Sequence, residues 1–418
     1  MRVEILTIGA ELLLGYTVDT NAAFMARALS EIGIAVVRHD TVGDDPELIA
    51  RAMSDGLERT GAVITTGGLG PTADDRTRYA LAAAFGSELL TDDAVLAQLE
   101  RRFQLFGRPM PKINVVQALV PRGARVIENS YGSAPALWME DERGRWVLTL
   151  PGVPREMRGL LKDAVIPLLR ERAGTATTVV ASRTLRTTGI GESALAELLG
   201  DDGGDTVAGL PLAYLPGWEG VDLRVTAAEM PASEAERALA DAAARLRERA
   251  GRYIYGEGAA DMAAVVLQLC RERALTIATG ESCTGGLIGA RLTAVPGSSE
   301  VYLGGVVAYS NAVKESMLGV PGELIRREGA VSEAVARQMA AGARARTGAG
   351  VGIAVTGIAG PGGGSPEKPV GTVWIAVETD EGVRSSGRVY VGDREEVRSR
   401  ASQAALDTVR GMLTAERG

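Results

Sequence analysis

Three short apolar segments of the chain run directly into glycine-rich turns. These segments are residues 62–66, 276–279 and 351–356, and a helix or a loop signal follows each of them. A short apolar run bounded by glycine is typical of a buried parallel strand. Parallel strands need long crossover connections, usually helices that cover the sheet on both faces. The sequence therefore predicts layered α/β structure.

The length and the order of the signals predict more than one domain. At 418 residues the chain is too long for one ordinary core. Strand and helix signals alternate through residues 1–171 and again through residues 257–418, which predicts two three-layer α/β domains. Residues 172–256 between them read as a small α+β module, with a connector at 172–178 and an acidic loop at 200–205.

Individual elements follow from periodicity, caps and apolar runs. The expected strands are residues 3–8, 34–37, 62–66, 146–150, 179–187, 208–215, 221–227, 276–279, 302–309, 351–356 and 370–377. The expected helices are residues 21–31, 46–59, 74–85, 92–106, 233–250, 261–273, 284–293, 333–346 and 394–412, with a further helix that begins at residue 192.

Composition excludes several classes of protein. The formal net charge of −8 argues against direct nucleic-acid binding, which normally needs a basic face. The apolar runs are shorter than a membrane span needs, and the N-terminus reads as a first strand rather than a targeting segment. Two cysteines, Cys270 and Cys283, make no disulfide framework and no zinc pattern. We therefore expect a cytoplasmic protein without a membrane partner.

His39 is the only histidine of the chain. It follows the apolar run 34–37 and precedes a turn-rich segment, so we interpret it as a surface residue at the end of a strand. Acid–base chemistry in this protein then falls to Lys, Tyr, Asp or Glu.

Three segments near the C-terminus carry candidate chemistry, namely residues 279–286, 309–314 and 356–364. Each begins where an expected strand ends, and open α/β sheets bind ligands at the carboxyl ends of their strands. Ser282, at a strand–helix junction, can act as a nucleophile while neighbouring amides hold an oxyanion. Alternatively, Ser282 is a helix N-cap, and Cys283 is either the nucleophile or a buried apolar residue.

The motifs ESCTGG, YSNxxK, GAVS, TGIAGP and KPVGTVW occur here in that order. The set resembles the C-terminal domain of the CinA family, which also occurs alone as nicotinamide mononucleotide amidohydrolase. The resemblance implies hydrolysis of nicotinamide mononucleotide to nicotinate mononucleotide and ammonia, without a cofactor. It implies Ser282 as nucleophile, Lys314 as its base and Tyr309 as a supporting hydroxyl. The implied substrate-binding residues are Glu281, Thr284, Gly285, Gly286, Asn311, Thr356, Gly357, Gly360 and Gly363.

The implied serine–lysine chemistry does not need a histidine. A lysine whose ammonium is desolvated can be neutral at working pH and accept the proton of a serine. Taken alone, Lys314 is instead a solvated helix residue. Glycines around such a site let backbone amides approach a phosphate.

A similar junction lies in residues 65–77, where a strand ends in glycines and a helix is expected to begin with Asp74 and Asp75 in its first turn. One interpretation is simple helix capping. The other is a phosphate cradle in which Asp74 or Asp75 holds a divalent cation that bridges a pyrophosphate.

This run, together with residues 9–13, 19–21, 42–45 and 151–157, resembles the molybdopterin-binding fold shared with gephyrin-like proteins, in the form found at the N-terminus of the CinA family. The resemblance implies metal-dependent cleavage of ADP-ribose to AMP and ribose 5-phosphate. A divalent metal of the Mg, Mn or Co class would be held by Asp74 and Asp75. The implied substrate contacts are Gly67, Gly68, Gly70, Thr72, Glu11, Asp19 and Asn21.

The N-terminal resemblance is incomplete. The family pattern N-P-x-G-x-A-P-G is Asn129-Ser-Tyr-Gly-Ser-Ala-Pro-Ala136 here, which changes the loop over the expected ligand. The N-terminal half is therefore either a pyrophosphatase or a non-catalytic nucleotide-binding or oligomerisation module. A third interpretation is an accessory protein of DNA uptake or repair, and a molybdopterin role rests on fold analogy alone. The middle module resembles the KH-like insert of CinA proteins, and the family resemblance implies a homodimer.

Overall fold

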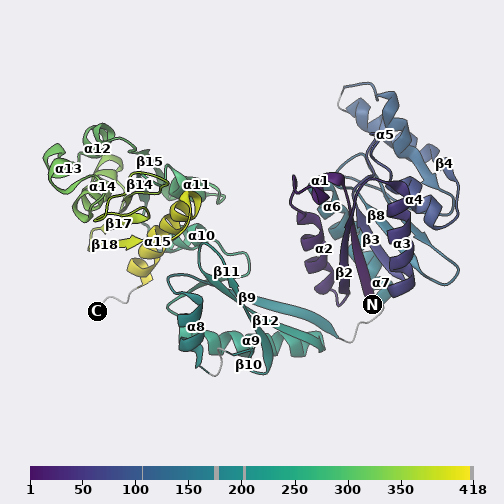
Figure 1. The fold of residues 1–418 in the computed structure, drawn as a ribbon, viewed down its shortest axis with the longest axis horizontal. Coiled ribbons are helices and arrows are strands. Elements are labelled where there is room, and N and C mark those ends of the chain that lie inside the picture. Colours follow the sequence, from purple (N-terminus) through teal and green to yellow (C-terminus); the bar gives the residue numbers. More distant parts are fainter. Residues whose placement is uncertain (106, 174–177, 201–203, 415–418) are drawn as a thin grey trace. The chain divides into compact units, whose positions relative to one another are not determined.

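The structure is a computed structural model that describes residues 1–105, 107–173, 178–200 and 204–414 (Figure 1). The expected connector 172–178, the acidic loop 200–205 and residue 106 lie partly or wholly outside the described residues. One unit comprises residues 1–181 and 227–237, and a second comprises residues 182–226 and 238–418. Among the described residues, no helix combines the length and the apolar character needed to cross a membrane.

The first unit contains a mixed sheet with the strand order β2-β1-β3-β8-β7-β6. Strands β2, β1, β3 and β8 are parallel, as expected, whereas β7 and β6 run antiparallel at one edge. The link between β7 and β8 is too short for a crossover, so these two strands must form a hairpin. The bounds are β1 (Arg2–Ile8), β2 (Ala35–Val42), β3 (Ala62–Thr66), β6 (Arg125–Ile127), β7 (Ala136–Glu140) and β8 (Trp146–Leu150), with β4 (Leu89–Thr91) and β5 (Leu119–Pro121) in a separate pair.

Helices cover both faces of this sheet, each over its own hydrophobic core. One layer contains α2 (Thr20–Ser30), α6 (Pro154–Leu160) and α7 (Ile166–Ala173), the last two joined by a π-helical turn. The other contains α3 (Pro46–Thr60), α4 (Thr77–Ala84) and α5 (Asp93–Leu105). Short helices α1 (Ala10–Leu13) and η1 (Lys112–Ala118) lie in the connections. The expected three-layer α/β architecture is confirmed.

Two expectations in this unit were wrong in position. Strand β2 extends to Val42, so His39 lies inside the strand rather than at its end, although its side chain is exposed as expected. Helix α4 begins at Thr77, so Asp74 and Asp75 precede the helix instead of occupying its first turn. The reason is that Asp75 accepts hydrogen bonds from backbone N–H groups earlier in the loop, which closes a turn before the helix starts.

The middle elements form a sheet with the order β10-β11-β12-β9-β13, which confirms an α+β module. Their bounds are β9 (Val179–Thr187), β10 (Thr206–Val207), β11 (Leu210–Pro216), β12 (Val221–Met230) and β13 (Ile254–Glu257), with helices α8 (Glu192–Leu199) and α9 (Ala232–Ala250).

The C-terminal domain is built on a sheet with the order β15-β14-β16-β17-β18. Strands β15, β14 and β16 are parallel, and β17 and β18 are antiparallel additions. The sequence did not indicate β18, because its residues are mostly polar or small and largely exposed. The strand bounds are β14 (Ile277–Glu281), β15 (Tyr302–Val307), β16 (Val351–Gly357), β17 (Thr372–Thr379) and β18 (Gly382–Val389).

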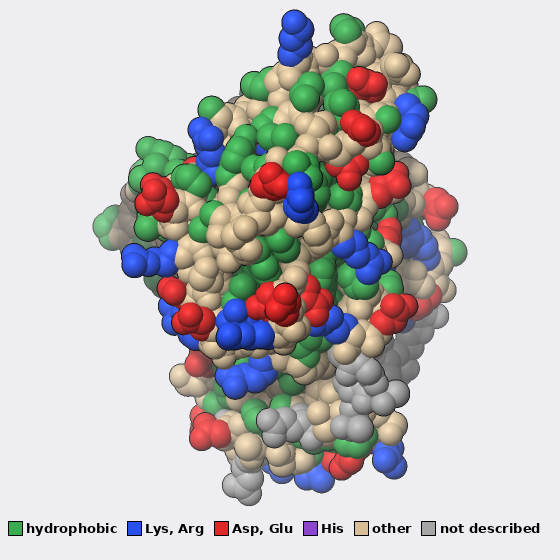
Figure 2. Space-filling view, turned by 90° about the vertical axis from the view of Figure 1, so that its right-hand side faces the viewer, with side chains coloured by type: hydrophobic (Ala, Val, Ile, Leu, Met, Phe, Trp, Pro, Cys, Tyr) green, Lys and Arg blue, Asp and Glu red, His purple; other side chains and the backbone are tan. Residues whose placement is uncertain are grey.

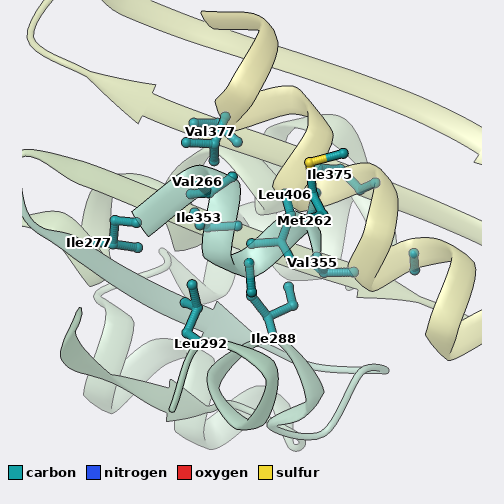
Figure 3. Packing of buried hydrophobic residues seen from close by; sticks show 14 of the residues in the cluster. Met262, Val266, Ile277, Ile288, Leu292, Ile353, Val355, Ile375, Val377 and Leu406 are labelled. Carbon is teal, nitrogen blue, oxygen red and sulfur yellow. The ribbon is translucent and has the colours of Figure 1, made fainter. Parts of the chain in front are cut away.

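Two helical layers again enclose this sheet. A core that includes Met262, Ile353 and Leu406 lies on one face (Figure 3). A second core that includes Met339 and Ala354 lies on the other. The first layer holds α10 (Met262–Glu272), α11 (Leu287–Thr293) and α15 (Arg394–Thr414), and the second holds α12 (Asn311–Leu318), α13 (Gly322–Glu328) and α14 (Glu333–Thr347).

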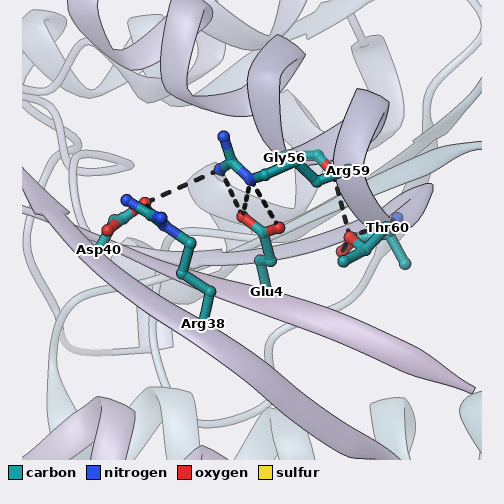
Figure 4. Close-up of polar contacts among 7 residues, drawn as sticks. Glu4, Arg38, Asp40, Gly56, Arg59 and Thr60 are labelled. Atoms are coloured by element: carbon teal, nitrogen blue, oxygen red, sulfur yellow. Dashed lines mark hydrogen bonds and ion pairs between the residues drawn. The ribbon is translucent and has the colours of Figure 1, made fainter.

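Close packing of α3 against the N-terminal sheet depends on a glycine. The Glu4 carboxylate on β1 is buried and accepts hydrogen bonds from Arg59 Nε at 2.9 Å and Arg59 Nη2 at 2.6 Å (Figure 4). One turn earlier on α3, a Cβ at Gly56 would lie 2.6 Å from Val63 Cγ2 and 3.3 Å from Glu4 Oε2. The helix can therefore reach Glu4 only because residue 56 has no side chain.

We expect Gly56→Ala to destabilise the first unit by about 1–3 kcal/mol, because overpacking outweighs the better helix propensity of alanine. Calorimetric unfolding of the whole chain would show one transition at lower temperature. The matched control is Gly411→Ala on α15, where the Cβ would meet only the flexible end of Arg384 at 3.3 Å. Equal melting profiles for G56A and the wild type would contradict the packing argument.

Candidate active sites

The structure brings Ser282 and Lys314 together at the carboxyl edge of the C-terminal sheet. Ser282 follows β14, and Lys314 lies in the first turns of α12, whose N-cap Ser310 accepts a hydrogen bond from the Val313 amide. The Lys314 Nζ atom lies 3.1 Å from Ser282 Oγ and donates to the Ala308 carbonyl at 2.8 Å. The exposed fractions are 8% for Ser282 and 2% for Lys314. The solvated-helix interpretation of Lys314 is therefore wrong.

The electrostatic surroundings of Lys314 favour the neutral amine. Burial lowers the pKa of Lys314, because it desolvates the ammonium. No carboxylate in the described part of the chain forms an ion pair with Lys314, so nothing of that kind offsets the desolvation. A neutral amine at hydrogen-bond distance from a serine hydroxyl is a suitable general base.

Glu281, expected as a substrate contact, is used inside the protein. Its buried carboxylate accepts hydrogen bonds from the amides of Gly286 at 3.0 Å, Ile288 at 3.1 Å and Gly289 at 2.9 Å. It thereby satisfies the start of α11, whose N-cap is Gly286. The N-cap interpretation of Ser282 is wrong for the same reason. Those three amides are already occupied by Glu281.

Two other amides beside Ser282 remain available. In the described part of the chain, the N–H groups of Cys283 and Thr284 donate to no oxygen. The buried Thr284 hydroxyl likewise has no partner there. The Cys283 side chain packs in the hydrophobic core, and burial raises its pKa to about 12. Cys283 is therefore a poor nucleophile, whereas its amide can face a ligand.

Tyr309 lies beside this pair but is bonded elsewhere. Its side chain is 62% exposed, and its hydroxyl accepts a hydrogen bond from Arg394 Nη2 at 2.9 Å. Arg394 also donates to the Gly360 carbonyl at 2.6 Å, and Arg398 donates to the Thr284 carbonyl at 2.9 Å. Neither arginine was expected at the site from the sequence. Their spacing of four on α15, which puts them on one helix face, was the available signal.

The remaining expected contacts differ in what they can offer. The Thr356 hydroxyl donates to the Ala330 carbonyl at 2.8 Å, so it is engaged. Gly357 is required by packing, since a Cβ there would lie 3.0 Å from Cys283 Sγ. Asn311 is exposed at the start of α12. Positive φ angles occur at Gly285, Gly286, Gly360 and Gly363, where glycine is favoured.

In the first unit, Asp75 and Arg78 shape the glycine loop that follows β3. Asp75 accepts hydrogen bonds from Gly70 N at 2.6 Å, Thr72 N at 2.8 Å and the Thr72 hydroxyl. Buried Arg78 donates to the Gly70 carbonyl at 3.1 Å and to the Leu69 carbonyl. Together, Asp75 and Arg78 fix the backbone of this loop. Arg78 was also missed from the sequence.

Expected contacts from the start of the chain lie near this loop. The Asn21 amide donates to Gly152 O at 2.7 Å and Thr66 Oγ1 at 3.2 Å, while Asn21 Oδ1 is buried without a partner in the described residues. Asp19 caps α2 and lies 3.1 Å from His39 Nε2. Glu11 is exposed on α1. Gly67 and Gly68 have positive φ, and a Cβ at Gly67 would lie 2.1 Å from the Ile8 carbonyl oxygen.

A pocket of about 370 Å³ adjoins the loop, with Thr72, Arg76, Tyr79 and Lys112 in its lining. Its two cations and one aromatic ring suit a phosphorylated ligand. Across the described residues, no group of three or more acidic, His or Cys side chains is arranged to hold a metal. The nearby Thr72 side chain and the backbone amide of Asp74 lower the pKa of Asp74 and favour its ionised form. Asp75 lines the pocket and Asp74 precedes it in the same loop, so a cation there would have these carboxylates and ligand phosphates as its ligands, the usual way proteins bind Mg²⁺.

Comparison with known proteins places these sites in a family. Residues 259–413 match the model described as CinA C-terminal domain, residues 4–171 the "Probable molybdopterin binding domain" and residues 182–256 the "Damage-inducible protein CinA KH domain". A CinA-like protein of Gemmatimonas aurantiaca is 56% identical over 100% of this chain and 98% of its own length. The chain belongs to the CinA family.

Other CinA relatives agree with this assignment. A CinA-like protein of Salinibacter ruber is 45% identical over 99% of this chain and 100% of its own length. The crystal structure of a competence/damage inducible protein from Agrobacterium tumefaciens is 43% identical and covers 36% of this chain and 93% of its own, with a TM-score of 0.36.

The surface of this CinA protein shows mixed charge. On the face drawn in Figure 2, acidic and basic side chains are intermingled. This pattern agrees with the net charge of −8 and differs from the clustered lysines and arginines typical of nucleic-acid-binding faces.

The lowered pKa of Lys314 predicts a pH-dependent stability difference between the wild type and Lys314→Met. Between the native pKa and the unfolded value of about 10.4, the unfolded lysine binds more protons, so the stability of the wild type rises with pH. Methionine does not titrate. The free energy of unfolding of K314M minus that of the wild type should therefore decrease as the pH rises from 7 to 10.

Denaturant titrations at several pH values would measure this difference. The control is Lys368→Met, since the Lys368 amine also donates to backbone carbonyls, at 2.8 Å from both Glu328 O and Val331 O, but is less buried. If the difference in unfolding free energy between K314M and the wild type stays constant over this pH range, burial does not lower the pKa of Lys314.

Proposed function

We propose that the C-terminal domain is an amidohydrolase that converts nicotinamide mononucleotide to nicotinate mononucleotide and ammonia. The observation that carries the proposal is the 3.1 Å contact between Ser282 Oγ and buried Lys314 Nζ, beside the Cys283 and Thr284 amides, which donate to no oxygen in the described part of the chain. The substrate comes from the motif resemblance to amidohydrolases of the family. The geometry supports hydrolysis of an unactivated amide through a serine, because it supplies a nucleophile, a base and oxyanion donors.

In the first step, Ser282 Oγ attacks the carboxamide carbon while its proton passes to neutral Lys314 Nζ. The carbonyl oxygen becomes an oxyanion, which the N–H groups of Cys283 and Thr284 can hold. Lys314 then returns the proton to the amide nitrogen, and the C–N bond breaks to release ammonia. An ester between Ser282 and the nicotinoyl group is left.

In the second step, water attacks the ester carbon and gives its proton to Lys314. The intermediate collapses, the serine oxygen takes the proton back, and nicotinate mononucleotide leaves. The Ala308 carbonyl orients Lys314 throughout, since it accepts one N–H of the amine at 2.8 Å. Tyr309 and Arg394 together join the end of β15 to the glycine loop at Gly360, which suits a role in enclosing the substrate.

We expect Ser282→Ala and Lys314→Ala each to lower kcat by at least about 10³-fold, since loss of one member of a nucleophile–base pair disables the pair. The measurement is ammonia and nicotinate mononucleotide formed from nicotinamide mononucleotide in EDTA. The rate of the wild type should fall as the pH drops through the lowered pKa of Lys314, because the base becomes protonated.

Cys283→Ala is the matched control, because it alters the neighbouring side chain and keeps the amide. It should retain activity within about tenfold if the serine is the nucleophile. Wild-type turnover by folded S282A, or loss of turnover only in C283A, would overturn the assignment.

We further propose that the N-terminal domain cleaves ADP-ribose to AMP and ribose 5-phosphate. The supporting observation is the pocket beside the loop, with Arg76 and Lys112 as cations and Tyr79 as an aromatic surface. The well-ordered hydrogen bonding of the altered segment also supports it. Asn129 donates to Ala134 O at 2.8 Å and accepts from the amides of Tyr131 and Gly132, so the loop keeps a defined shape without the family proline.

A divalent cation held by Asp74 and the substrate would neutralise pyrophosphate charge in this reaction. Asp75 has a structural role, because its carboxylate closes the loop by accepting hydrogen bonds from the amides of Gly70 and Thr72. Arg78 fixes the loop carbonyls, and Arg76 and Lys112 can bind phosphate oxygens.

We expect EDTA and Asp74→Asn each to lower AMP formation from ADP-ribose by at least about tenfold, as removal of one charged ligand contact does. Asp93→Asn on α5 is the control for loss of an exposed carboxylate in the same unit. AMP formation that is unaffected by EDTA and by D74N would rule out the metal site, and no AMP from the wild type would favour a non-catalytic binding domain.

A further inference from the structure

A second pocket of about 450 Å³ lies within the second unit, away from Ser282 and Lys314. Residues 188–192 and 216–221 of the α+β module line one side, and residues of β18 and α15 line the other. The two sides are tied together near the pocket, since Arg291 pairs with Glu219 at 3.2 Å and Arg410 donates to the Arg252 carbonyl at 2.9 Å. The volume is within the range of small-molecule sites.

Several buried polar atoms of this pocket have no partner among the described residues. Gln403 is 2% exposed, and its Oε1 accepts a hydrogen bond from Arg291 at 2.9 Å. That bond fixes the orientation of the amide, so the unpartnered Nε2 is a true donor. Arg400 Nε and the Tyr390 hydroxyl are also buried without a partner. Native proteins rarely leave such donors unsatisfied, so the pocket-lining residues Tyr390, Arg400 and Gln403 have unused hydrogen-bonding capacity for water or a ligand.

The charges around the pocket favour an anion. Arg388 and Arg400 form no ion pair within the described residues, whereas Asp407 is neutralised by Arg410 at 2.7 Å and Glu219 by Arg186 and Arg291. Glu192 is the remaining lining carboxylate. The N-cap of α8, Gly191, offers no side-chain bond to the first turn, and a Cβ there would meet nothing within 4 Å. In the part of the chain that is described, no N-cap side chain bonds the start of this helix, where an acceptor oxygen of a ligand could bind.

An aromatic surface completes the site. Trp218, 47% exposed, lines the pocket on the loop between β11 and β12. An exposed indole can stack on a planar base. We propose that this pocket binds a nucleoside monophosphate, with Arg388, Arg400 and the α8 N-terminus at the phosphate and Trp218 at the base. This site is separate from both proposed catalytic sites, and none of its residues belongs to either.

The test is calorimetric titration of the whole chain with AMP, adenosine and inorganic phosphate. Arg388→Gln should weaken one AMP-binding event by at least about tenfold, because it removes a charge-assisted contact to phosphate. Trp218→Leu should weaken AMP but leave phosphate unchanged. The control is Arg384→Gln, which removes an equally exposed arginine four residues earlier on β18 and outside the pocket.

Binding is measured without turnover, so its outcome is independent of the proposed activities. AMP bound by the other domains would persist in both arginine variants. Superimposable AMP isotherms for the wild type and R388Q would overturn the proposal. If adenosine binds as tightly as AMP, the phosphate makes no contact. If inorganic phosphate binds as tightly as AMP, the base makes none. Either result would overturn the proposal too.

Discussion

The buried carboxylate of Glu281 determines the shape of the C-terminal site. By accepting from the amides of Gly286, Ile288 and Gly289, it anchors the turn between β14 and α11. The turn then presents Ser282 at the end of β14, and the amides of the next two residues donate to no oxygen within the described residues. The Glu281 oxygens thus bond the start of the helix rather than the neighbouring lysine.

The glycine loop of the N-terminal domain is held by a comparable arrangement with an added cation. Asp75 accepts hydrogen bonds from the amides of residues 70 and 72, and Arg78 donates hydrogen bonds to the carbonyls of residues 69 and 70. Side chains inside the protein thus fix the backbone of both strand-to-helix junctions. Such preorganisation lets backbone groups contact a ligand without reordering when it binds.

The layered fold was accessible from sequence because short apolar runs and glycines are local signals, whereas the Ser282–Lys314 pair was expected only from the resemblance of five ordered motifs to the CinA family. The α/β layers, the parallel central strands and the burial of Cys283 follow from these signals. Strand β18 was missed because an exposed edge strand needs no apolar pattern. The early start expected for α4 was wrong because acidic residues favour both a helix start and a loop closure. Only the hydrogen bonds that Asp75 accepts from Gly70 and Thr72 distinguish the two. Arg78, Arg394 and Arg398 act through backbone carbonyls that sequence alone cannot place.

The placement of charge explains how a chain with one histidine can still carry a base. A lysine paired with a carboxylate would have a raised pKa and would stay protonated, which would prevent it from accepting the proton of Ser282. Glu281 is adjacent in sequence to Ser282, yet its oxygens face the amides of α11. Lys314 instead bonds a neutral carbonyl, which orients the amine with less stabilisation of its charge than a carboxylate would give. Burial without an acidic partner among the described residues lowers the pKa of Lys314, which costs the fold some stability and favours the neutral amine that can act as a base.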